Sequence, residues 1–222
     1  MPRKSRRTAA SLAPSGRAGG SDRLGPRLRA ARETAGVTVR GLARNLGVSA
    51  SLVSQIETGR VMPSVGTLYA MANELGLLVD DLFRDGKAAP QQASSDTGPA
   101  RPGPVQRSCG RETIHLSGGV RWERLTPTSD AEVEFLYVVY DVGATSCEED
   151  ALIRHGGKEY AYLLSGRLGI RVGFEEFELR PGDSISFDAQ NPHRLWTIGD
   201  KPAVAVWVVL NRHADRRRRK RP

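Results

Sequence analysis

Residues 38–76, TVRGLARNLGVSASLVSQIETGRVMPSVGTLYAMANELG, decide the fold of the N-terminal half of the chain. Their apolar residues recur at spacings of three and four in short bursts, which is the period of an amphipathic helix. Gly47 separates two of these bursts, and a sharp turn between helices favours glycine because glycine accepts a positive φ. Thr38 and Ser49 precede the bursts and are expected to cap the two helices with their hydroxyl groups. The segment therefore predicts two short helices joined by a tight turn.

The second of these helices has two different faces. Leu52, Val53 and Ile56 share one face at helical spacing and are expected to be buried. The residues of the opposite face are Ala50, Ser51, Ser54 and Gln55. Small and amide side chains suit the major groove of DNA, where glutamine can pair with adenine through two hydrogen bonds, so Gln55 is the best candidate for reading a base. Each residue alone is also typical of an ordinary helix surface, and only the joint arrangement carries the prediction.

That arrangement, with LARNLGVSASLVSQIETGR at residues 42–60 as its core, resembles the phage-repressor type of helix-turn-helix, the XRE or Cro/C1 family. The resemblance covers about 60 residues, and it implies a recognition helix lying in the major groove of a duplex operator. It implies that Ala50, Ser51, Ser54 and Gln55 lie near base edges. It also implies that Thr38, Arg40 and Arg60 lie near phosphates, with Ser49 at the start of the recognition helix. Such regulators usually bind as homodimers to two half-sites.

The chain changes character along its length, and this predicts a multidomain protein. Residues 1–20 and 212–222 are basic and lack apolar periodicity, so we expect a disordered arm and a disordered tail. Residues 21–86 are expected to form an all-α helix-turn-helix domain of four to five helices. Residues 87–110 are dense in alanine, proline, glutamine, serine and glycine and indicate a flexible linker. Residues 111–211 form the remaining domain.

This last domain is predicted to be all-β. β-Branched and aromatic runs separated by glycine, proline and aspartate are typical of short antiparallel strands in a sandwich or barrel. The clearest runs are Val133 to Tyr140, Tyr160 to Leu164, Leu168 to Val172 and Val204 to Leu210.

Residues 154–196, RHGGKEYAYLLSGRLGIRVGFEEFELRPGDSISFDAQNPHRLW, resemble the cupin family, a double-stranded β-barrel whose mouth often holds a metal or a small ligand. His155 and Glu159 follow the first family motif, and His193 follows the second. Full cupin metal sites use three histidines and one glutamate, and Ile153 stands where the first ligand belongs. The resemblance thus implies a reduced set of His155, Glu159 and His193, which suits a divalent metal with open coordination positions. The alternative is that these side chains form hydrogen bonds to a small-molecule effector or to one another.

The residues around this set leave the ligand's charge open. Arg154 and Lys158 would favour an anionic ligand, whereas the acidic residues at 148–150 would favour a cationic one. Four aromatic residues of strands are candidates for a pocket lining, although such residues more often belong to a core. They are Tyr160, Tyr162, Trp196 and Trp207. His115 and His213 lie outside both motifs and are expected at the surface.

Composition narrows the functional class. The net charge is +8, but the positive charge is concentrated in the two ends of the chain. These ends either attract phosphate without choosing a sequence or serve only as disordered solubilising segments. Cys109 and Cys147 form no disulfide framework and are expected to be free thiols. The absence of a signal peptide and of an apolar run long enough for a bilayer predicts a cytoplasmic protein without membrane contact.

Together these observations predict a sequence-specific transcription regulator, acting as a repressor by family habit. Its cupin domain would sense a small-molecule effector, and it would need neither catalysis nor an obligatory cofactor. Two alternatives stay open. One is a cupin metalloenzyme, an oxygenase or isomerase, fused to a DNA-binding domain. The other is an architectural dimer whose basic ends bind DNA without sequence choice.

Overall fold

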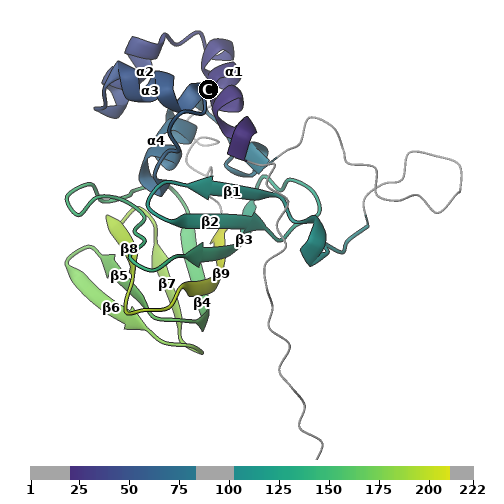
Figure 1. Ribbon diagram of the computed structural model, residues 1–222, viewed down its shortest axis with the longest axis vertical. Helices are drawn as coiled ribbons and strands as arrows, with labels where there is room; N and C mark the ends of the chain where they lie inside the picture. Colours follow the sequence, from purple (N-terminus) through teal and green to yellow (C-terminus); the bar gives the residue numbers. More distant parts are fainter. Residues whose placement is uncertain (1–20, 84–102, 211–222) are drawn as a thin grey trace, which may run out of the picture.

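The computed structural model describes residues 21–83 and 103–210 (Figure 1). The predicted arm at 1–20, the predicted tail at 212–222 and most of the predicted linker at 87–110 lie outside these residues. Helices occupy the described residues before the linker and strands those after it, as the sequence predicts. Within the described ranges, no helix combines the length and the apolar character that crossing a bilayer requires.

The helical part contains four α-helices and one short 3-10 helix among the residues described. They are α1 (Ser21–Thr34), α2 (Val39–Leu46), α3 (Ala50–Glu57), α4 (Val65–Leu75) and η1 (Asp80–Phe83).

The helix boundaries of the turn follow the local sequence. The Thr38 hydroxyl accepts a hydrogen bond from the Gly41 N–H at the start of α2, and the Ser49 hydroxyl accepts one from the Leu52 N–H at the start of α3. Both caps satisfy backbone donors that have no partner inside the helix. Gly47 has a φ of 69°, a left-handed conformation that favours glycine. The predicted caps and turn are confirmed.

The faces predicted to be apolar form the helical core. Leu42, Val53 and Ile56 are fully buried, whereas Leu52 is only partly buried. Helix α1 approaches α3 closely at Gly25, where a Cβ atom would lie 2.3 Å from the Ile56 carbonyl oxygen. A side chain at this position would therefore push the two helices apart.

A buried ion pair joins α1 to the end of α3. Arg32 donates from Nε to Glu57 Oε1 at 2.6 Å and from Nη2 to Glu57 Oε2 at 2.9 Å. Arg32 Nη1 also donates to the Val37 carbonyl oxygen, so the guanidinium is bonded on several sides. Two-point contact of this kind fixes the orientation of both side chains. The pair therefore holds the recognition helix α3 against α1.

The β part has two antiparallel sheets. The strands are β1 (Thr113–Leu116), β2 (Val120–Arg124), β3 (Val133–Tyr140), β4 (Lys158–Ser165), β5 (Leu168–Val172), β6 (Glu175–Leu179), β7 (Ser184–Asp188), β8 (His193–Thr197) and β9 (Ala203–Leu210). One sheet has the order β1-β2-β3-β9-β4-β7 and the other β6-β5-β8. A further 3-10 turn, η2 (Ser108–Gly110), precedes β1.

Two of the four aromatic residues that were expected in a pocket lining or in the core lie in neither place. Tyr160 and Tyr162 are 40% and 48% exposed on the outer face of β4, so they belong neither to a pocket nor to the core. Side chains of a strand alternate between its faces, and Glu159 occupies the inner face, which turns Tyr160 and Tyr162 outward. Trp207, by contrast, is buried on the inner face of β9.

Other surface and thiol predictions are confirmed within the described residues. His115 is exposed on β1, and Cys109 and Cys147 are both free, Cys109 exposed and Cys147 buried. His213 lies outside the described residues.

Candidate functional site

The recognition face of α3, made of Ala50, Ser51, Ser54 and Gln55, lies opposite the buried face of the helix. Ser51 and Ser54 are exposed, and Ala50 and Gln55 are half-buried. Gln55 Nε2 donates to Ser51 Oγ at 3.3 Å, one helical turn earlier. Such a bond is weak and exposed, and a base edge could replace it. The structure thus brings the four predicted residues together, and their contact with bases stays a prediction.

The residues expected near phosphates surround this face. Thr38 and Ser49 are exposed at the starts of α2 and α3, where free backbone N–H groups attract anions. Their hydroxyl oxygens accept the capping bonds, which leaves each hydroxyl hydrogen available to a phosphate. Arg40 on α2 and Arg60 just after α3 are exposed.

A second candidate site lies inside the β part, where His155, Glu159 and His193 come together as predicted. His155 follows an isolated bridge at Ile153, Glu159 lies on β4, and His193 begins β8. Their exposed fractions are 5%, 3% and 1%. One ligand atom from each lies within 4.8 Å of the other two. We call these three side chains the buried cluster.

Backbone carbonyl groups orient both imidazoles of the buried cluster. His155 Nδ1 lies 3.0 Å from the Gly156 carbonyl oxygen, and His193 Nδ1 lies 2.9 Å from the Asn191 carbonyl oxygen. Since a carbonyl oxygen only accepts, each Nδ1 is the donor, and in a neutral imidazole Nε2 then carries a lone pair. Both Nε2 atoms face Glu159 Oε1, at 2.7 Å from His155 and 3.4 Å from His193.

Three lone pairs that converge in a buried space repel one another unless a cation lies between them. His155 Nε2 accordingly has no hydrogen-bond partner within the described part of the chain. A proton or a divalent metal satisfies this arrangement. Histidines that bind metal commonly donate their other N–H to a backbone carbonyl, as both do here. The residues therefore fit a metal ion.

The charges of the cluster match this chemistry. Burial opposes ionisation of Glu159, but the close contact with His155, the nearby imidazole of His193 and the Trp207 indole hold the pKa of Glu159 below its usual value. Trp207 Nε1 donates to Glu159 Oε2 at 2.9 Å. Burial also lowers the pKa of His193, against the opposing effect of Glu159. An ionised carboxylate and a neutral imidazole are the forms that bind metals.

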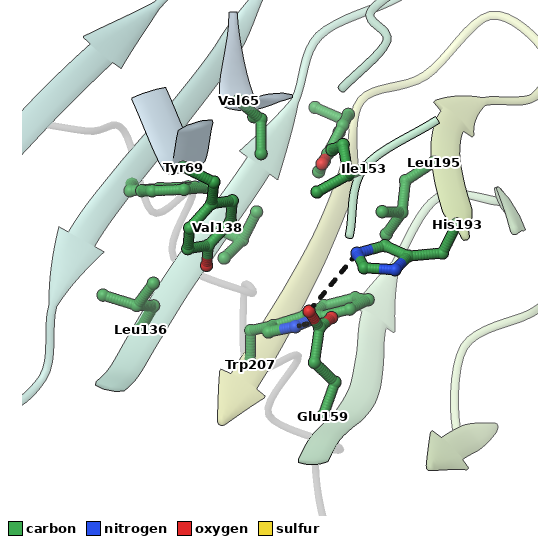
Figure 2. A pocket seen from close by; sticks show the side chains of 11 residues that line it. Val65, Tyr69, Leu136, Val138, Ile153, Glu159, His193, Leu195 and Trp207 are labelled. Carbon is green, nitrogen blue, oxygen red and sulfur yellow. Dashed lines mark hydrogen bonds and ion pairs between the residues drawn. The ribbon is translucent and has the colours of Figure 1, made fainter. Parts of the chain in front are cut away.

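A small cavity of about 20 Å³ lies beside the cluster, inside a space of about 330 Å³ that includes open solvent (Figure 2). Most of its lining is apolar or aromatic. The lining residues are Val65, Tyr69, Trp122, Leu136, Val138, Tyr140, Ile153, Glu159, His193, Leu195 and Trp207. Ile153, at the position of the missing cupin ligand, is buried and contributes an apolar wall.

The charged residues that flank the cluster in the sequence do not line the cavity. Arg154 and Lys158 are exposed, as are the acidic residues at 148–150. Arg154 donates to the Gln190 carbonyl oxygen instead. The polarity of the cavity therefore comes from Glu159 and His193 of the buried cluster and from the hydroxyl groups of its tyrosines.

Two residues of this site were not assigned a role from the sequence. Trp207 was considered only as a possible lining residue, yet it orients Glu159. Residues 203–210, AVAVWVVL, are all apolar, so no alternation in the sequence tells which face of the strand lies inside. Tyr69 belongs to the helical part, and no local signal connects it with the cupin motif.

The fold and the two sites define a DNA-binding helix-turn-helix protein that carries a cupin domain. Residues 23–84 match the helix-turn-helix domain family, and residues 136–209 match the cupin domain family. The chain therefore belongs to the XRE-type helix-turn-helix transcription regulators that have a C-terminal cupin domain.

Similar proteins support this family assignment. The HTH-type transcriptional regulator PuuR of Escherichia coli strain K12 is 23% identical over 172 residues, which are 76% of this chain and 84% of PuuR. The uncharacterized HTH-type transcriptional regulator YazB of Bacillus subtilis strain 168 is 38% identical over 58 residues, 26% of this chain and 84% of YazB. The crystal structure of an HTH_3 family transcriptional regulator from Vibrio cholerae aligns with a TM-score of 0.60 at 21% identity, covering 86% of this chain and 96% of that one.

Proposed function

We propose that the protein is a one-component repressor whose helix-turn-helix part reads a duplex operator and whose cupin cavity binds a small-molecule effector. The observation that carries the sensing role is the cavity with the buried cluster at its side. Ligand sites in proteins are typically concave and largely apolar, with a few polar groups that fix the orientation of the ligand. This cavity has that composition.

The lining indicates the chemical class of the effector. No lysine or arginine lines the cavity among the described residues, so a multiply charged anion is poorly matched. The fitting ligand is a small, mostly apolar molecule with one polar group that meets Glu159 or His193. A divalent metal such as Fe²⁺, Mn²⁺ or Zn²⁺ would be held by the same three side chains and would supply an anchor for that polar group.

We further propose that the protein binds its operator as a homodimer. The support is the recognition helix itself, since helix-turn-helix proteins read two half-sites about one helical turn apart. One copy of this chain presents a single recognition face, so a two-fold symmetric operator needs a second copy.

The decisive experiment selects bound duplexes from a random DNA pool with the purified full chain. The affinity for the winning sequence is then compared with that for a scrambled duplex at physiological salt. A two-fold symmetric motif preferred at least about a thousandfold supports operator reading. Enrichment without any motif, with affinity that collapses as salt rises, would instead favour the architectural alternative.

The effector role is tested by measuring operator affinity against a panel of small molecules with the metal-loaded and the metal-free protein. A true effector changes operator affinity in the wild type and not in Glu159→Gln. A compound that acts equally on both proteins binds outside the cavity.

A catalytic role is the second candidate, because three protein ligands leave coordination positions open toward the cavity. It predicts that the Fe²⁺-loaded chain consumes oxygen or converts a candidate substrate over many turnovers, and that His193→Ala abolishes this. Binding of one equivalent without turnover favours the sensor.

A further inference from the structure

One wall of the cupin cavity belongs to the DNA-binding part of the chain. Val65 and Tyr69 lie four residues apart on α4, which places both side chains on one face of the helix. Both are buried, with 3% and 5% of their surface exposed, and both line the cavity. Figure 2 shows them entering the cavity opposite Glu159 and His193.

Tyr69 connects this wall to the buried cluster. Its ring lies over the imidazole of His155, with 4.3 Å between ring centroids and 31° between planes. The centroid of the same ring lies 5.5 Å from that of the Trp122 ring. Its hydroxyl donates to Glu134 Oε2 at 3.2 Å on β3. A side chain of the DNA-binding part thus rests directly on one of the three candidate ligands.

The backbone around Tyr69 is also attached to the β part. The Gly66 N–H donates to the Ser146 carbonyl oxygen at 3.3 Å, and the Ser117 N–H donates to the Pro63 carbonyl oxygen at 2.9 Å. A Cβ atom at Gly66 would lie 3.3 Å from the Ile153 side chain, so α4 lies in close contact with the cavity wall.

The neighbouring part of the same broad buried face of α4 belongs to the helical core. Leu68, Met71 and Ala72 are fully buried there, and α4 contacts both α1 and α2. Because α4 contacts both the cavity wall and the helices α1 and α2 that pack against α3, a shift of α4 at the cavity should be passed to α3 through those two helices.

We propose that the ligand site of the cupin domain is shared with the DNA-binding domain, and that Tyr69 couples occupancy of the cavity to the position of the recognition helix. The inference rests on the proposed function and adds to it the path of regulation. A ligand that fills the space beside His155 meets the Tyr69 ring and displaces it or packs against it. By linkage, operator DNA must change ligand affinity by the same factor as the ligand changes operator affinity.

The first test uses Co²⁺ alone as the probe. Operator affinity of the full chain is measured with and without saturating Co²⁺, and Co²⁺ binding is followed separately by its visible absorption. We expect Co²⁺ to change the operator affinity of the wild type by at least about fivefold, the lower end of typical coupling between sites. In Tyr69→Leu, the ratio of operator affinities with and without Co²⁺ should fall toward one. Co²⁺ should still bind, since Tyr69 is not one of the candidate metal ligands. Tyr162→Leu, which makes the same substitution at an exposed tyrosine on the outer face of β4, keeps the wild-type ratio.

A second test locks the contact by a disulfide. A Cβ atom at position 66 would lie 3.4 Å from Cys147 Cβ, close to the separation of about 3.5–4.5 Å found in disulfides. The Gly66→Cys variant, with exposed Cys109 changed to serine, is therefore expected to form a bridge to Cys147 when oxidised glutathione is added. Burial raises the pKa of the Cys147 thiol, so oxidation is carried out at mildly alkaline pH.

The bridged protein should bind operator with an affinity that no longer responds to Co²⁺, and reduction should restore the response. The same variant with Cys147→Ser controls for the substitution itself. Unchanged coupling in both Tyr69→Leu and the bridged protein refutes the role of α4. So does a wild type that binds Co²⁺ and operator independently. A wild type that selects no operator refutes the proposed function instead, and one that binds no Co²⁺ refutes the metal site at the buried cluster.

Discussion

The recognition face of α3 and the buried cluster both consist of polar side chains, yet Ser51 and Ser54 are exposed while the three cluster residues are nearly inaccessible. On α3, the polar groups make few bonds and stay hydrated until DNA arrives. In the cluster, loss of hydration is offset by bonds to backbone carbonyls and to Trp207. Substitutions on α3 should therefore change binding alone, whereas substitutions in the cluster should also change the surrounding fold.

The largest expected effect comes from Glu159→Gln, which keeps an acceptor for Trp207 but removes the charge that both imidazoles face. Co²⁺ affinity should fall at least about 100-fold, because even groups that only orient a metal ligand contribute roughly 10–100-fold. Operator affinity without metal should remain within about twofold, since the helical DNA surface is untouched.

The matched control is Glu178→Gln, an exposed carboxylate paired with Arg167 and Arg180, whose pKa those partners lower to about 2. It should leave both affinities unchanged. Equal losses in the two variants would contradict a metal site at the cluster. Absorption titration and fluorescence anisotropy measure the two affinities.

The next effect in size is that of Gln55→Ala on operator affinity. Loss of a two-point contact to adenine should cost about 1–3 kcal/mol on the selected operator, with little loss on random DNA. Anisotropy titrations with both duplexes measure the difference. Gln190→Ala, an exposed glutamine of the β part, serves as the control. A similar loss on both duplexes would remove Gln55 as a base-reading residue.

A smaller effect is expected from Arg40→Ala. A lost phosphate contact weakens binding to all sequences alike and reduces the slope of log affinity against log salt by about one. Arg29→Ala on α1, which removes an exposed pair with Glu33, is the control. A change that depends on the DNA sequence would show that Arg40 contacts bases.

Acid should weaken the β part but not the recognition face, and this is the smallest effect. The folded protein lowers the pKa of His193 and of Glu159 from their ordinary values of 6.5 and 4.5, so the unfolded chain takes up protons first as pH falls. The contribution of His193 to stability is complete above its ordinary pKa. It is lost as the pH falls through the lowered pKa of the folded protein. Glu159 acts likewise at lower pH. Melting curves should show a falling midpoint, and His193→Gln should flatten this dependence below neutrality.

Local chemistry made the turn predictable, since Thr38, Ser49 and Gly47 act on backbone groups within three residues of themselves. The same held for the buried cluster, whose spacing follows a family motif. Helix α3, however, is also held by Arg32 and Glu57, which lie 25 residues apart in the chain. A pairing of that kind depends on how helices pack, and helical periodicity does not report it.

Strand alternation predicted which residues share a face but not which face lies inside. On β4 the aromatic face is outside because Glu159 must reach the cluster. The role of Tyr69 could not be predicted from the sequence for a different reason. Its contact with His155 joins two domains, and each domain's sequence pattern describes only its own core.

The arrangement of the tryptophans supplies an internal optical probe. Of the three tryptophans in the chain, Trp122 and Trp207 line the cavity, and Trp207 donates to a cluster carboxylate. Trp196 is not among the lining residues; it stacks beneath Arg194 on β8. Paramagnetic or coloured ions and aromatic compounds that enter the cavity should quench emission from the first two indoles far more than from the third. Ligands can therefore be screened on the unlabelled protein by the change in its tryptophan emission.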